Sequence, residues 1–79
     1  MLTEPNYRGH RIEVYAELSD GHWDATVRIR RLISEECLRV ERVPCRKVTA
    51  ALAETRAAIW AKRWVDQHCP EREPATRLA

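Results

Sequence analysis

The dipeptide Asp20-Gly21, with an alternating apolar pattern on each side, constrains the fold of this chain more than any other feature. Asp-Gly is favoured in two-residue type I′ turns, because both central residues of such a turn need a positive φ angle. A turn at this point pairs each apolar residue of the first run with an apolar residue of the second. The predicted pairs are Ile12–Ile29, Val14–Val27, Ala16–Ala25 and Leu18–Trp23. The sequence therefore predicts a β-hairpin over residues 11–31 with one apolar face.

The polar residues of this hairpin alternate with the apolar ones and fall on its opposite face. On that face the same register sets Glu13 against Arg28, an attractive pair, and Glu17 against Asp24, a repulsive pair. We expect this second face of the sheet to be in water.

A third strand is predicted after a turn through residues 34–36. In the segment "CLRVERV" we place Leu38 and Val40 on the apolar face, and Arg39 and Glu41 on the polar face. Its exact register is left open. Pro44 closes the strand, because proline donates no hydrogen bond to a ladder.

From Thr49 onward the apolar residues recur at helical spacing. Thr49 is the expected N-cap, and the helix is predicted to run to about His68, before Pro70. The face toward the sheet is expected to hold Ala53, Ala57, Trp60, Ala61, Trp64, Val65 and His68. Leu52 and Ile59 fall seven residues apart on another side, where they either widen this face or mark a second contact surface. The chain contains no phenylalanine, so the tryptophans are core candidates.

These elements predict an α+β fold, a three-stranded antiparallel β-meander with one C-terminal helix packed on one face (β-β-β-α). Seventy-nine residues allow a single domain. We expect that domain to span residues 7–69, between a flexible N-terminal arm (residues 1–6) and a disordered C-terminal tail (residues 70–79).

The composition indicates a cytoplasmic protein with no strong preference for a polyanion. Fourteen basic and 12 acidic residues are interleaved and give a net charge of +2, which is mild for a dedicated nucleic-acid domain. No apolar run approaches 18 residues, so neither a signal peptide nor a membrane span is expected. Three irregularly spaced cysteines predict free thiols in a reducing compartment, not a disulfide framework.

No motif of catalysis, cofactor binding or metal binding stands out. Two glycines cannot form a glycine-rich phosphate loop. Cys45, His68 and Cys69 are zinc-ligand types, but the chain lacks the closely spaced cysteine pair that a zinc site uses. Any cysteine can be paired on paper with any histidine as nucleophile and base, so that pattern is unspecific. We therefore expect no enzyme, no cofactor and no metal.

The segments "YRGHRIEVYA" and "DGHWDATVRIRR", with a closing helix that ends "AIWAKRWVDQH", resemble a group of small proteobacterial proteins of unknown function. The resemblance covers Tyr7 to about His68 and implies the β-β-β-α fold, but no activity. The order of elements is also similar to the latter part of a double-stranded RNA-binding domain. The chain lacks that family's first helix and its lysine cluster, for which Arg46-Lys47 would be the substitute.

The polar sheet face is the candidate anion-binding or partner-binding site. Its candidate residues are Arg11, Tyr15, Arg28, Arg30 and Arg39. Guanidinium groups on adjacent strands can bind phosphate or carboxylate, although cross-strand ion pairs in water are the simpler interpretation. We expect a non-enzymatic protein-interaction module that uses this face or the edge of the third strand. Its partner is expected to be another protein or a second copy of this chain. The alternative is nucleic-acid binding by the four arginines with Arg46 and Lys47, with Tyr15 as the stacking aromatic.

Overall fold

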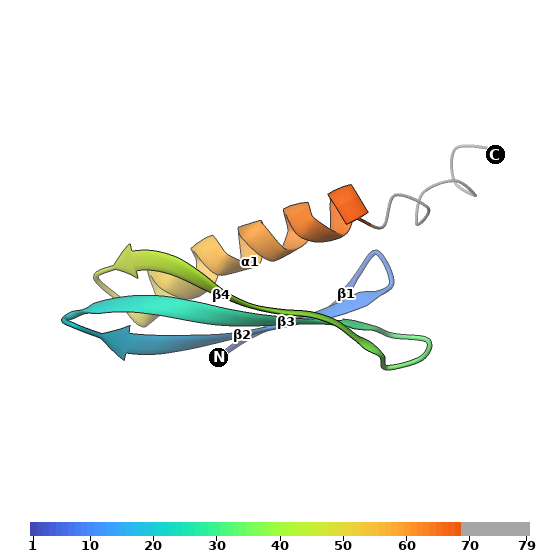
Figure 1. Cartoon of the computed structure of the whole chain (residues 1–79), viewed down its shortest axis with the longest axis horizontal. Helices are drawn as coiled ribbons and strands as arrows, with labels where there is room; N and C mark the ends of the chain where they lie inside the picture. Colours follow the sequence, from blue (N-terminus) through green and yellow to red (C-terminus); the bar gives the residue numbers. More distant parts are fainter. Residues whose placement is uncertain (69–79) are drawn as a thin grey trace.

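The computed structural model describes residues 1–68 and shows four antiparallel strands followed by one helix (Figure 1). The strands form one sheet in the order β1-β2-β3-β4, and α1 packs on one of its faces. The elements are β1 (Leu2–Tyr7), β2 (His10–Ser19), β3 (His22–Arg31), β4 (Cys37–Lys47) and α1 (Ala50–His68). The predicted α+β class, antiparallel sheet and C-terminal helix are confirmed, but the predicted number of three strands is wrong. The predicted tail, residues 70–79, lies outside the described residues.

The central hairpin of β2 and β3 has the predicted register. All four predicted apolar pairs lie directly opposite each other. Asp20 and Gly21 form the turn with φ angles of 51° and 80°, as a type I′ turn requires. Leu18 lies close to this turn and is 62% exposed, so it adds little to the core in which it was expected.

The additional strand is β1, in the segment that we expected to be a flexible arm. A second two-residue turn, Arg8-Gly9, joins it to β2, with φ angles of 52° and 79°. The Asn6 side-chain oxygen accepts a hydrogen bond of 2.9 Å from the Gly9 N–H and supports this turn. Pro5 is tolerated because β1 is an edge strand and one side of its backbone needs no partner.

The first half of β4 has its faces reversed from the prediction. Arg39 lies opposite Ile29, and Glu41 lies opposite Val27, so both charged residues are on the face that α1 covers. Val40 lies opposite Arg28 on the other face and is 54% exposed. The cause is a shift in the β3–β4 register between Ile29 and Arg30, where β4 carries one residue more than β3.

Leu38 nevertheless packs against the edge of the core, as predicted. The two charged residues are tolerated on the helix side because α1 lies over β2 and β3 more than over β4.

The core between the sheet and α1 is built from small and β-branched side chains. None of the three tryptophans is fully buried; they pack half-buried around this cluster. The buried residues are Ile12, Val14, Ala25, Val27, Ile29, Val43, Ala53, Ala57, Ala58, Ala61 and Val65. Alanines on the buried side of α1 let the helix backbone approach the sheet closely.

The ends and the solvent side of α1 agree with the sequence pattern. The Thr49 hydroxyl accepts a hydrogen bond of 3.2 Å from the Leu52 N–H, which confirms Thr49 as the N-cap. Leu52 and Ile59 are both exposed, and His68, expected toward the sheet, is exposed as well.

Candidate functional site

The sheet face turned away from α1, called the outer face below, carries four of the five predicted site residues. Arg11 lies directly opposite Arg30 on the neighbouring strand, and Tyr15 lies opposite Thr26. Arg28 is on the same face between these two pairs. Arg39 does not join them, because the register shift in β4 places it on the helix side.

The remaining members of the alternative nucleic-acid set are also separated from this cluster. Lys47 pairs with Trp23 near the Asp20-Gly21 turn, whereas Arg11 and Arg30 lie toward the opposite end of the hairpin. Arg46 adjoins Lys47. The structure therefore does not gather the six basic residues into one patch.

The outer face can be followed as three rows of residues across β2, β3 and β4. The first row holds Tyr15, Thr26 and Arg42; the second holds Glu13, Arg28 and Val40; the third holds Arg11, Arg30 and Cys37. Tyr15 and Val40 are 37% and 54% exposed. Apolar and aromatic surface thus lies between guanidinium groups.

The acidic residues of the outer face are engaged by specific arginines. Glu13 faces Arg28 in the register, but its ion pair is formed with Arg30, at 3.7 Å between Oε1 and Nε. Glu17 is engaged by Arg42, at 3.3 Å. Arg11 and Arg28 form no ion pair with any residue in the described part of the chain. These two cations are therefore available for a partner's acidic groups.

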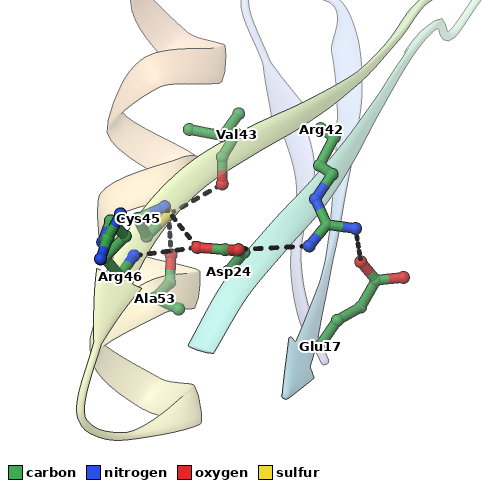
Figure 2. A network of polar contacts seen from close by, with 7 residues as sticks. All are labelled: Glu17, Asp24, Arg42, Val43, Cys45, Arg46 and Ala53. Atoms are coloured by element: carbon green, nitrogen blue, oxygen red, sulfur yellow. Dashed lines mark hydrogen bonds and ion pairs between the residues drawn. The ribbon is translucent and has the colours of Figure 1, made fainter. Parts of the chain in front are cut away.

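A second polar cluster, centred on Asp24, was not predicted (Figure 2). One oxygen of the buried Asp24 carboxylate, Oδ1, accepts hydrogen bonds of 2.9 Å from the backbone N–H groups of both Cys45 and Arg46. Its other oxygen accepts a bond of 3.2 Å from Arg42, whose second terminal nitrogen contacts Glu17.

An irregularity in β4 explains why a carboxylate is needed there. Ala25 pairs with Val43 and Trp23 pairs with Lys47, so β4 has two more residues than β3 over this interval. Arg46 has a φ angle of 55°, in the left-handed region. The N–H groups of the bulged residues turn away from the regular ladder, and Asp24 supplies the acceptor that they need.

One signal in the sequence could have revealed this cluster. The predicted register sets Glu17 against Asp24, and two facing carboxylates need a neighbouring cation. Arg42 lies beside Asp24 on the next strand and contacts both carboxylates. The apparent repulsive pair is thus two parts of a three-residue charge cluster.

Cys45 lies at the same bulge and does not have the properties of a nucleophile. Its Sγ lies 3.3 Å from the Val43 carbonyl oxygen and 3.5 Å from the Ala53 carbonyl oxygen, so the thiol donates toward backbone (Figure 2). Burial, and then the nearby Asp24 charge, raises the pKa of the Cys45 thiol above its ordinary value. A protonated thiol is a poor nucleophile and a poor metal ligand. We therefore assign the Asp24 cluster to the stability of β4.

Elsewhere on residues 1–68, few features indicate catalysis or ligand binding. A partly open hollow on α1 is lined by Trp60, Arg63, Trp64 and Gln67. Trp64 stacks on His68, with 4.5 Å between the ring centroids. Within residues 1–68, no group of three or more His, Cys, Asp or Glu side chains is placed to hold a metal ion.

Comparisons with known proteins identified no matching family model, curated protein or solved structure. The resemblance to small proteobacterial proteins stays a prediction. α1, the one helix in the described part of the chain, is not both long and apolar enough to cross a membrane.

Proposed function

We propose that this protein is a non-enzymatic interaction module that binds another protein with its outer face. The observation that carries this proposal is that exposed Tyr15 and Val40 lie among arginines on a sheet face that no other described element covers. Tyrosine and arginine are enriched at protein interfaces, since both combine apolar surface with polar ends. The surface is small and mixed in character, as expected of a reversible contact.

The charges on this face favour a partner with acidic side chains. Glu13 and Glu17 are held by Arg30 and Arg42, which leaves Arg11 and Arg28 for intermolecular contacts. Arg28 lies between Glu13 and Val40, so a partner that reaches it also contacts apolar surface. Free thiols at Cys37 and Cys45 support a reducing compartment such as the cytoplasm.

Affinity capture with matched surface variants tests this proposal. Partners are captured from cells that produce the protein, with wild type, with Tyr15→Ser/Arg28→Ser, and with Leu52→Ser/Ile59→Ser as the control on the exposed side of α1. Proteins specific to wild type should persist with the α1 variant and decrease about tenfold or more with the outer-face variant, since interface tyrosine and arginine often dominate binding. The opposite pattern, or no specific protein with wild type, would contradict the proposal.

Nucleic-acid binding by the same face is the second candidate. Arg11 directly opposite Arg30, with exposed Tyr15 further along β2, gives two adjacent cations and one aromatic ring for stacking. Phosphate contacts require an affinity that falls steeply with salt, so binding is measured with labelled RNA and DNA at about 50 mM and about 200 mM salt. No binding at the lower concentration would dismiss this candidate.

A further inference from the structure

The two edges of the sheet differ in how well they are protected from another strand. β1 is short, contains Pro5 and has an irregular register with β2 near Tyr7. β4 is the longest strand, and its residues Arg39–Val43 pair with β3 in regular register before the bulge begins. Pro44 and the bulge obstruct the second half of β4 only. The open edge is therefore the first half of β4.

Charged residues on the helix side of β4 restrict which strand can bind there. Arg39 and Glu41 face the α1 side, and their own ion pair along the strand shows that both side chains lie on one face. A partner strand with like-charged residues opposite them would repel these charges, and one with apolar residues would desolvate the Arg39–Glu41 ion pair without offering it a new polar partner. The edge is thus selective for a strand with an acidic and a basic residue at alternate positions.

The strand that meets this requirement is β4 itself. In a continuous antiparallel sheet related by a twofold axis, residues of the same face must lie opposite each other. An axis at Val40 sets Arg39 of each copy opposite Glu41 of the other, and the two Val40 side chains opposite each other. Axes at Arg39, Glu41 or Arg42 would each bring two like charges together.

We propose that two copies of this chain associate through the first half of β4, antiparallel about a twofold axis at Val40, and form one eight-stranded sheet. This inference goes beyond the proposed function, since the contact is made by the edge of β4 and not by the outer face. The two reciprocal Arg39–Glu41 pairs replace the ion pair within each strand. The exposed Val40 side chains become covered on the outer face. A strand-edge interface is small, so we expect a dissociation constant on the order of 10 µM.

Charge reversal at the two positions tests this register by sedimentation equilibrium. Arg39→Glu gives two acidic pairs in the homodimer, and Glu41→Arg gives two basic pairs; each variant alone should dimerise about tenfold more weakly or worse. An equimolar mixture of the two variants should regain wild-type association, because each heterodimer pair is again attractive. The double variant Arg39→Glu/Glu41→Arg should also regain it. Arg46→Glu, beyond the paired segment, should behave as wild type.

The mixture also controls for folding, because two misfolded variants would not restore each other. A wild type that stays monomeric up to about 1 mM, or single variants that dimerise as well as wild type, would overturn the inference. Failure of the mixture and of the double variant to regain association would overturn it as well. None of these results affects capture of other proteins through Tyr15 and Arg28, so failure of the dimer and failure of the proposed function are distinguishable.

Discussion

Asp24 replaces the hydrogen-bond acceptors that β4 loses at its bulge. It accepts from the backbone of two successive residues and from Arg42. The hydrogen bond from the Arg46 N–H is the largest cause of a lowered Asp24 pKa, and Arg42 and the Cys45 N–H add to it, while partial desolvation opposes it. The folded protein therefore prefers the ionised carboxylate.

This preference predicts a loss of stability in acid that depends on Asp24. Because the folded-state pKa is below the ordinary value of 3.8, the contribution is fully present above that value and is lost as the pH falls through the folded-state pKa. Asp24→Asn keeps an acceptor oxygen but loses the charge. We expect the variant to be less stable than wild type near pH 7 and the difference to shrink toward about pH 2, as measured by urea unfolding.

Asp20→Asn is the matched control, since it makes the same chemical change in an exposed turn. Its difference from wild type in the free energy of unfolding should not shrink between pH 7 and about pH 2 in the way expected for Asp24→Asn. A difference for Asp24→Asn that is constant over the whole pH range would contradict the assignment of Asp24 as the charged acceptor of the bulge.

The two hairpin turns show what could and could not be predicted about single turns and strands. Asp20-Gly21 was identified because Asp-Gly is a known turn pair and apolar alternation flanks it. Arg8-Gly9 adopts the same conformation, but arginine is not a usual first residue, and the strand before it is short and contains proline. The alternation in β4 was interpreted with the wrong face because one extra residue inverts the pattern.

The backbone conformation of the Asp20-Gly21 turn can be tested directly. A Cβ at Gly21 would meet no atom within 4 Å, so the effect of a substitution comes from its φ angle of +80° and not from a clash. Gly21→Ala should lower the free energy of unfolding by about 1 kcal/mol, measured by urea denaturation. Gly21→Asn should cost less, because asparagine tolerates the left-handed region better. Equal losses for both variants would argue against a type I′ turn.

The fold class and most of the outer face could be predicted from the sequence. Arg11, Tyr15, Arg28 and Arg30 were placed correctly because the β2–β3 register follows from local alternation alone. β1 was missed because much of what secures it is distant in sequence. The Tyr7 hydroxyl donates to Asp66 in α1, at 2.9 Å and 3.1 Å from its two oxygens. Local patterns carry no information about such a contact.

Loss of this long-range contact should weaken the whole fold. Tyr7→Phe removes the hydroxyl and keeps the ring, so we expect a decrease of about 1 kcal/mol in the free energy of unfolding, measured by thermal or urea denaturation. Tyr15→Phe is the matched control, since Tyr15 is 37% exposed and its hydroxyl has no partner among the described residues; it should be near neutral. Equal effects of the two substitutions would show that the Tyr7–Asp66 contact does not stabilise the fold.

The contacts between β1 and α1 also have a consequence for the order in which the chain folds during synthesis. β1 is made before the other described elements, but its ion pair from Glu4 to Lys62 and its hydrogen bond from Tyr7 to Asp66 need residues made near the end of the described chain. Until α1 exists, only β2 can hold β1 in place, while the β2–β3 hairpin can already form. Among the described strands, the earliest one made is thus the last to be secured, and before that its apolar residues are open to chaperones and proteases.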